Sequence, residues 1–242
     1  MKLAYLSKSV IMSITVVILL GFQHGQLNKE EYEKSGEITW EVQTKKKVIA
    51  LTFDDGPNGT YTNQVLDVLK ENNAKATFFV IGENVKRDSR TLIRTHTEGH
   101  EIGNHTFTHP KLQNIDLISV EKEIKQTDDI VMKYIAQKPL YFRPVGGYYN
   151  EEIVKAAVDT NHKIILWSQD TRDWNHESAD HIYKQVMDNI HPGDIILLHD
   201  GGGDRTETVQ AIKRLIPALK KKGYALLTIS ELKNLANDKS PS

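Results

Sequence analysis

Five groups of polar residues along this chain combine the residue types that metal-dependent hydrolysis needs. The sequence has no cysteine, so a catalytic zinc-type ion would be held by imidazoles and carboxylates. The same side chains also serve as general bases and acids. In chain order the groups are Asp54-Asp55-Gly56, His105-Thr-Phe-Thr-His109, Arg143, Asp170-Thr-Arg-Asp173-Trp174 and Leu197-Leu-His199-Asp200.

The first group ends an apolar run that is typical of a strand. Thr52 and Asp54 should share one face of it, because side chains alternate along a strand. Asp55 lies where Gly56 and Pro57 turn the chain. Two adjacent carboxylates suit a division of labour in which one binds a metal and the other acts as a base. The alternative is an ordinary Asp-Gly turn.

The second group is more specific. Two histidines four residues apart lie on one face of a helical turn and can share a metal. With Asp55, His105 and His109 make a ligand set of two imidazoles and one carboxylate, which leaves a position open for water. The alternative is a pair of surface histidines beside Pro110.

Arg143 follows a short predicted strand and precedes Pro144-Val-Gly146-Gly147. Near Asp54 it would keep that carboxylate ionised and oriented. The two glycines leave backbone N–H groups open to a ligand, which suits an oxyanion hole. A surface arginine before a turn is the alternative.

The last two groups place carboxylates and a histidine after further predicted strands. A histidine paired with a buried carboxylate has a fixed tautomer and a raised pKa, which suits a general acid. A solvated turn carboxylate and a core histidine are the alternative. Trp174 and Leu197 would wall a small apolar pocket, although ordinary core packing explains each residue taken alone.

Alternating strand and helix patterns must position these groups. After an early strand within 37–42, strands are predicted at 48–53, 76–81, 100–103, 141–142, 163–167, 194–198 and 224–228, with helices between them. This alternation predicts a parallel sheet in an α/β fold. Because polar groups follow five strand ends, we expect a (β/α) barrel of about seven strands rather than an open doubly wound sheet. Pro217 is expected to kink or split the helix at 205–222.

Length and charge set the organisation of the chain. Its 242 residues suit one domain, and a net charge of −1 gives no sign of a nucleic-acid partner. Two lysines precede an apolar run at 10–22, so residues 1–25 are predicted to be a signal peptide or an uncleaved signal anchor. Residues 26–44 are predicted to be a linker and residues 45–237 a single catalytic domain. We therefore expect a secreted or cell-wall protein, held at the membrane only through such an anchor.

The five motifs, in this order, resemble those of the polysaccharide deacetylases of carbohydrate esterase family 4. The resemblance implies a distorted (β/α) barrel and a divalent ion, zinc or alternatively cobalt or another metal. It implies that Asp54 is the base, oriented by Arg143, and that His199 is the acid, paired with Asp173. The implied metal ligands are Asp55, His105 and His109. Gly146 would supply an oxyanion N–H, and Trp174 and Leu197 would line the acetyl pocket.

One motif departs from the family pattern. Arg-Pro-Pro-aromatic-Gly is usual there, whereas this chain has Arg143-Pro144-Val145-Gly146-Gly147. The backbone N–H survives at Gly146, but the aromatic side chain that would cover it is lost, which bears on rate and substrate choice.

The function that follows is hydrolysis of N-acetyl groups on an N-acetylglucosamine polysaccharide. Peptidoglycan is the leading substrate and chitin oligomers are second. Two alternatives are a hydrolase of xylan acetyl esters and a non-catalytic glycan-binding protein of the same fold.

Overall fold

The computed structural model describes residues 29–237, so the segment predicted at 1–25 lies outside them. The chain falls into two compact units, the first ending at Ile38 and the second beginning at Thr39. In the first unit residues 29–35 are helical. The expected early strand is the two-residue β1 (Ile38–Thr39). No helix within residues 29–237 is long and apolar enough to cross a membrane.

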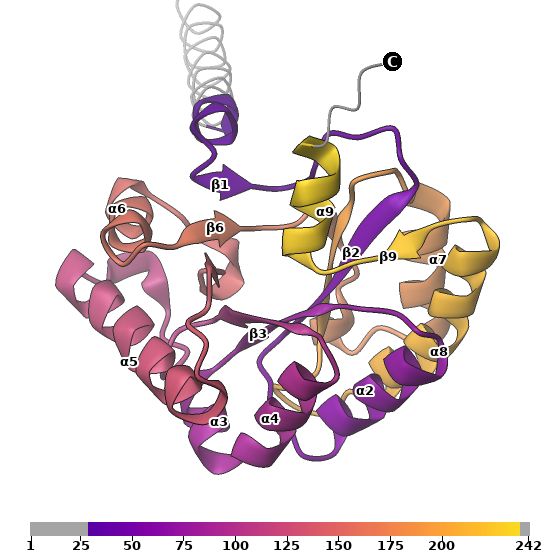
Figure 1. Ribbon diagram of the computed structural model, residues 1–242, viewed down its shortest axis with the longest axis horizontal. Helices are drawn as coiled ribbons and strands as arrows, with labels where there is room; N and C mark the ends of the chain where they lie inside the picture. Colours follow the sequence, from indigo (N-terminus) through magenta and orange to yellow (C-terminus); the bar gives the residue numbers. More distant parts are fainter. Residues whose placement is uncertain (1–28, 238–242) are drawn as a thin grey trace, which may run out of the picture. The chain divides into compact units, whose positions relative to one another are not determined.

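A curved parallel sheet forms the centre of the second unit (Figure 1). Its strands are β2 (Val48–Asp54), β3 (Thr77–Val80), β4 (Glu101–Asn104), β5 (Tyr141–Phe142), β6 (Lys163–Ile165), β7 (Gln169–Asp170), β8 (Ile195–His199) and β9 (Ala225–Leu226). Each pair of neighbouring strands among them runs parallel. The α/β class predicted from the alternation of elements is therefore confirmed.

The strand order is that of a barrel with one open seam. It runs β6-β5-β4-β3-β2-β8-β7, and β9 pairs with the start of β2. Although β6 and β7 are consecutive in the chain, they lie at opposite ends of this series of strands, and no pairing within the described residues joins them. The distorted barrel is thus a curled half-barrel. The expected seven strands are corrected to eight in this unit, because both residues of β7 are polar and no apolar run marks them.

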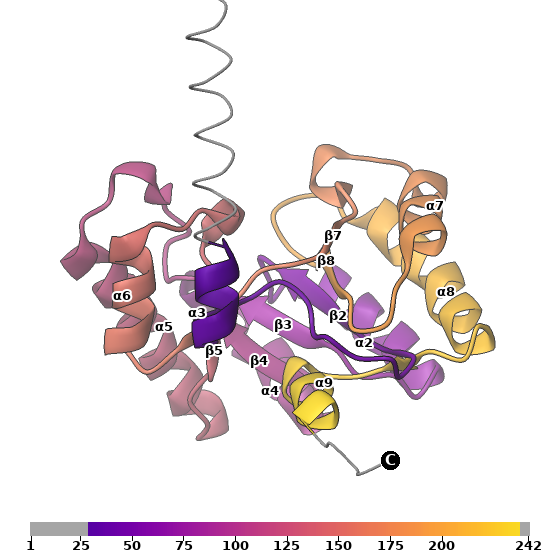
Figure 2. The same cartoon turned by 90° about the horizontal axis from the view of Figure 1, so that it is seen from above.

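Within the described part of the second unit, seven helices cover the outside of the sheet (Figures 1 and 2). They are α2 (Tyr61–Glu71), α3 (Gly82–Arg87), α4 (Ser89–Thr97), α5 (Leu117–Ile135), α6 (Glu151–Asp159), α7 (Ala179–Asn189) and α8 (Thr206–Lys221). The last helix, α9 (Ile229–Asn237), instead packs Ile229 and Leu232 against the inner face of the sheet. Figure 2 shows α5 and α6 at one end of the sheet, and α7 and α8 at the other. Ser178 caps the N-terminus of α7 by accepting a hydrogen bond from the N–H of His181.

Pro217 does not split its helix. It lies inside the single element α8, and both Pro217 and Lys213, one turn earlier, are exposed. The carbonyl group that loses its partner at a helical proline is that of residue i−4. Here that group lies on the solvent side, where water can satisfy it, so the helix continues through the proline.

The central strand β2 explains how the core and the site share one sheet. All seven residues of β2 are buried. Ile49, Leu51 and Phe53 pack into the core cluster that includes the helices α2 and α8. The alternate face carries Val48 and Ala50 in a second core cluster and then turns polar at Thr52 and Asp54. The register places Asp54 opposite His199 of β8, so the interior face ends in ionisable groups.

Candidate active site

Asp54 and Arg143 form a buried ion pair at the end of β2. Arg143 Nη1 donates to Asp54 Oδ1 at 2.7 Å and to Thr52 Oγ1 at 2.8 Å. The other guanidinium nitrogens donate to the carbonyl oxygens of Ile165 and Leu166, both at 3.0 Å. The structure thus brings Asp54 and Arg143 together and puts Thr52 and Asp54 on one face, as the strand pattern predicts. With no exposed surface, Arg143 holds this carboxylate in one orientation.

The three predicted metal ligands converge beside this pair. One ligand-type atom from each of Asp55, His105 and His109 lies within 4.8 Å of the others. Asp55 Oδ1 lies 3.1 Å from His109 Nε2 and 3.5 Å from His105 Nε2. Within the described part of the chain this buried oxygen makes no hydrogen bond, which is the arrangement expected of groups that share a cation rather than a proton. The residues therefore fit a divalent metal.

His105 is oriented by a backbone group. Its Nδ1 lies 2.7 Å from the carbonyl oxygen of Arg143. A carbonyl oxygen only accepts, so Nδ1 carries the hydrogen and Nε2, which faces Asp55, is left with a lone pair. Hydrogen bonds of this kind fix the ring of a metal-binding histidine.

The histidine pair does not lie on a helical turn, and that part of the prediction is wrong. Residues 105–110 form a loop in which Thr106 and His109 have φ angles of 70° and 57°. Glu123 of α5 holds the loop: its carboxylate accepts from the N–H groups of Phe107 at 2.8 Å and Thr108 at 2.7 Å. The four-residue spacing brings the imidazoles together through this loop.

Burial and neighbouring charges act on the pKa of each ligand. Burial alone raises the pKa of Asp55, but the imidazoles of His109 and His105 outweigh it and leave the pKa below its ordinary value. Burial lowers the pKa of His105, and the adjacent Asp55 raises the pKa of His109. A carboxylate that stays ionised and a buried neutral imidazole are both in the state that a metal requires.

His199, the last residue of β8, forms a second buried pair with Asp173 and lies opposite Asp54 of β2. His199 Nδ1 is 2.8 Å from Asp173 Oδ1, and the backbone N–H of His199 donates to Asp173 Oδ2 at 2.8 Å. Thr208 donates to the same Oδ2 at 2.8 Å. Burial lowers the pKa of His199, but Asp173 outweighs it and the pKa is raised. A protonated imidazole held beside Asp54 can donate a proton.

The three predicted substrate-binding residues lie in different settings. Gly146 has a φ angle of 65°, and a side chain there would have open space around its Cβ. Leu197 is buried in β8, whereas Trp174 is 48% exposed. The indole N–H of Trp174 approaches Asp170 Oδ1 at 3.3 Å, and Asp170 lies opposite Leu197 in the β7–β8 register.

Asp200 is a residue to which the sequence reasoning assigned no role. It is fully buried, accepts a hydrogen bond from the hydroxyl of Thr62, and lies against Gly56, where a Cβ would come 2.4 Å from Asp200 Oδ2. Burial raises the pKa of Asp200 to about 7. Its place beside His199 in the sequence was the only available signal.

A parallel half-barrel with an Asp-His-His group and buried acid–base pairs at its strand ends is the architecture of a metal-dependent hydrolase. The family model for polysaccharide deacetylase matches residues 41–165, and the chain belongs to this family, as its motifs predict. Enzymes of the family depend on a metal, and the present chain has a group of residues that fits one.

Several known proteins similar to this chain are named as deacetylases. A peptidoglycan-N-acetylglucosamine deacetylase of Bacillus cereus is 45% identical over 208 residues, which cover 85% of this chain and 97% of that protein. A chitooligosaccharide deacetylase of Rhizobium leguminosarum bv. trifolii is 36% identical and covers 79% and 94% of the two chains. The solved structure of a peptidoglycan N-acetylglucosamine deacetylase in complex with 4-naphthalen-1-yl-N-oxidanyl-benzamide has a TM-score of 0.81 at 36% identity, covering 84% and 96%.

Proposed function

We propose that this enzyme removes acetyl groups from the N-acetylglucosamine units of peptidoglycan. The observation that carries the proposal is the convergence of Asp55, His105 and His109 within 4.8 Å beside the buried pair of Asp54 and Arg143. The 45% identity to a peptidoglycan-N-acetylglucosamine deacetylase over most of both chains supports this polymer over chitin oligomers, which the less similar relative is named for.

Asp55, His105 and His109 would hold the metal, for which we propose zinc because two imidazoles and a carboxylate suit it. When bound, such an ion polarises the acetamide carbonyl and lowers the pKa of a nearby water. Asp54, oriented by Arg143, accepts the proton of the attacking water. The backbone N–H of Gly146 donates to the oxyanion that develops.

His199 completes the reaction. Its Nδ1 is occupied by Asp173, so Nε2 is the atom that donates a proton to the departing amine nitrogen. The carbon–nitrogen bond breaks, and acetate and a free amino sugar leave. Trp174 and Leu197 are proposed to border the acetyl methyl group.

The cellular setting follows from the same proposal. A cell-wall substrate requires export, which agrees with the signal or anchor proposed for residues 1–25, ahead of a linker at 26–44 and a catalytic domain at 45–237. The enzyme is then secreted or held at the cell surface, with the polysaccharide as its partner.

The test is acetate release from purified peptidoglycan and from N-acetylglucosamine oligomers, before and after chelation and with zinc restored. We expect release that chelator abolishes and zinc restores, with peptidoglycan the better substrate. Asp54→Asn should lower kcat on the order of 10²–10⁴-fold, the usual contribution of a general base, while zinc still binds. Wild-type turnover by a zinc-loaded Asp54→Asn protein would contradict the assignment, and faster release from acetylated xylan would redirect it to O-esters.

A further inference from the structure

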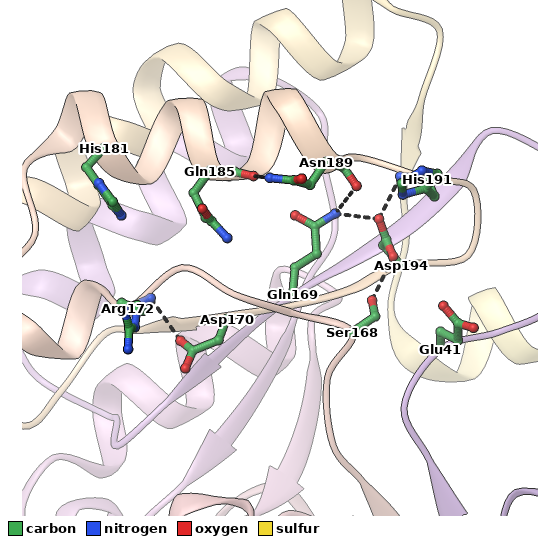
Figure 3. A pocket seen from close by; sticks show the side chains of 10 residues that line it. All are labelled: Glu41, Ser168, Gln169, Asp170, Arg172, His181, Gln185, Asn189, His191 and Asp194. Carbon is green, nitrogen blue, oxygen red and sulfur yellow. Dashed lines mark hydrogen bonds between the residues drawn. The ribbon is translucent and has the colours of Figure 1, made fainter. Parts of the chain in front are cut away.

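A polar pocket lies between strand β7 and helix α7, apart from the Asp-His-His group. Its volume is about 640 Å³, and all ten residues that line it are polar or charged (Figure 3). That volume is within the usual range for ligand sites. A lining with no apolar side chain suits a ligand that presents hydroxyl and amide groups over most of its surface.

Helix α7 supplies one wall of this β7–α7 pocket. His181, Gln185 and Asn189 recur every four residues, so they form one stripe along the helix. Ile182 and Val186 are the buried residues of the same helix. Figure 3 shows His181 and Gln185 pointing toward the β7 segment. The stripe therefore offers donors and acceptors to whatever enters the pocket.

Gln169 of β7 contributes an unsatisfied acceptor from the other wall. Its amide nitrogen donates to the carbonyl oxygen of Asn189 at 2.8 Å and to Asp194 Oδ2 at 2.5 Å. Both partners only accept, so the orientation of the amide is fixed. The side chain is 7% exposed, and its oxygen has no hydrogen-bond partner among residues 29–237. Figure 3 shows this oxygen on the side of Gln185. Because the oxygen is buried, a ligand donor would satisfy it only after neighbouring side chains of the wall move.

The pocket is joined to the catalytic machinery through Asp170. Asp170 lines it and accepts hydrogen bonds from the N–H of Arg172 at 2.8 Å and from the indole of Trp174 at 3.3 Å. It lies opposite Leu197, two residues before His199, which is roughly 7 Å along the strand. A neighbouring unit of a polymer whose acetyl group lies at His199 can span this distance.

The charges of the lining favour a neutral ligand. The carboxylates of Glu41, Asp170 and Asp194 outnumber the one arginine, Arg172. An anionic group would be repelled overall, whereas the hydroxyls and acetamide of an uncharged sugar match the available donors and acceptors.

We propose that the β7–α7 pocket binds a further N-acetylhexosamine unit of the same polymer, beyond the unit that is deacetylated. This inference rests on the proposed function, because it takes the polymer from there. Binding at a second unit adds affinity for long chains without changing the chemical step, so it acts on KM and leaves kcat unchanged.

The test compares Gln185→Ala and His181→Ala with the unsubstituted full chain. Gln210→Ala, at an exposed position of α8, is the matched control. Acetate release is measured with N-acetylglucosamine oligomers from the disaccharide to the hexasaccharide. Each pocket variant should raise KM for the hexasaccharide about fivefold to tenfold, the effect of losing one hydrogen bond or slightly more, and leave the disaccharide and kcat unchanged. The control should match the unsubstituted protein throughout.

A second readout separates failure of the pocket from failure of the activity. The side-chain amide signals of Gln169 and Gln185 are followed by NMR as hexasaccharide is added to the Asp54→Asn protein, and they should shift. The inference would be overturned if acetate release continued, KM depended on oligomer length equally in all variants, and the amide signals did not shift. If no oligomer or peptidoglycan released acetate, the proposed function would fall, and the amide shifts alone would then support or overturn the pocket.

Discussion

Replacing Asp173 with asparagine would remove the charge that, in the proposed mechanism, prepares His199 as an acid. The two side chains meet at 2.8 Å and both are buried. Unit charges about 4 Å apart interact by about 4 kcal/mol at an effective dielectric constant of about 20, which corresponds to an upper limit of about three pKa units. Opposite charges at this range shift a pKa by about 1–3 units in proteins. Asp173→Asn should therefore lower the pKa of His199, because Asp173 is what raises it.

The sign of the effect on activity follows from the proposed role of His199 as the general acid. A general acid must carry its proton, so activity is lost as the pH rises through its pKa. In Asp173→Asn the alkaline limb of the kcat/KM profile should move toward acid by about 1–3 pH units. At a fixed pH above both limbs, kcat/KM of the variant should be lower than that of the wild type by about tenfold for each pH unit that the limb has moved. The assay is acetate release from N-acetylglucosamine oligomers at saturating zinc over a range of pH.

Thr208→Val provides the matched control. It removes a neutral hydroxyl that donates to Asp173 Oδ2 at 2.8 Å, but it keeps the carboxylate charge beside His199. Its alkaline limb should move far less than that of Asp173→Asn. If folded Asp173→Asn protein, checked by circular dichroism, kept the wild-type alkaline limb, the assignment of His199 as the acid tuned by Asp173 would be refuted.

Two further substitutions test groups that support the site. Glu123→Ala should weaken zinc affinity about 10–100-fold, because groups that hold metal ligands in position have effects of that size. Glu121→Ala, on the same helix, is the control and should leave zinc affinity unchanged. Competition with a chromogenic chelator measures the zinc affinity of both variants. The buried Asp200, with a pKa raised to about 7, keeps a proton that the unfolded chain releases above about pH 4. The free energy of unfolding of the chelated protein should then fall as pH rises from about 4 to 7, by up to about 4 kcal/mol. Asp200→Asn should remove this contribution. Urea unfolding at about pH 4 and pH 7 measures the free energy of unfolding of both proteins. If that free energy changes with pH equally in both, the assignment to Asp200 is wrong.

Much of the fold could be read from patterns that depend on local sequence. Apolar runs located the long strands β2 and β8, because burial on both faces leaves a continuous signal. The two residues of β7 lie inside a polar motif, so no run marks them, and the seam beside them could not be anticipated. Pro217 was misjudged because its effect depends on where the freed carbonyl points, which the sequence does not record.

The site residues also differ in whether neighbouring residues or distant segments of the chain determine their positions. Strand alternation predicted that Thr52 and Asp54 share a face, since that depends only on period two. The spacing of His105 and His109 was read as helical, but left-handed residues in a loop produce the same closeness. Glu123 holds that loop from another element, fifteen and sixteen positions along the chain from the two N–H groups that it binds, and no pattern connects the two segments.

The burial of Arg143 has a consequence for how this enzyme tolerates mutation. Its guanidinium ties Asp54 of β2 to the carbonyl oxygens of Ile165, the last residue of β6, and of Leu166, which follows it. It also stacks 4.1 Å from the ring of Phe79. Active-site residues are often a source of instability, so that replacing them makes a protein more robust. Here the reverse is expected, because removing Arg143 leaves a buried carboxylate and two backbone acceptors without their donor. Selection for stability and selection for activity therefore act on this position in the same direction.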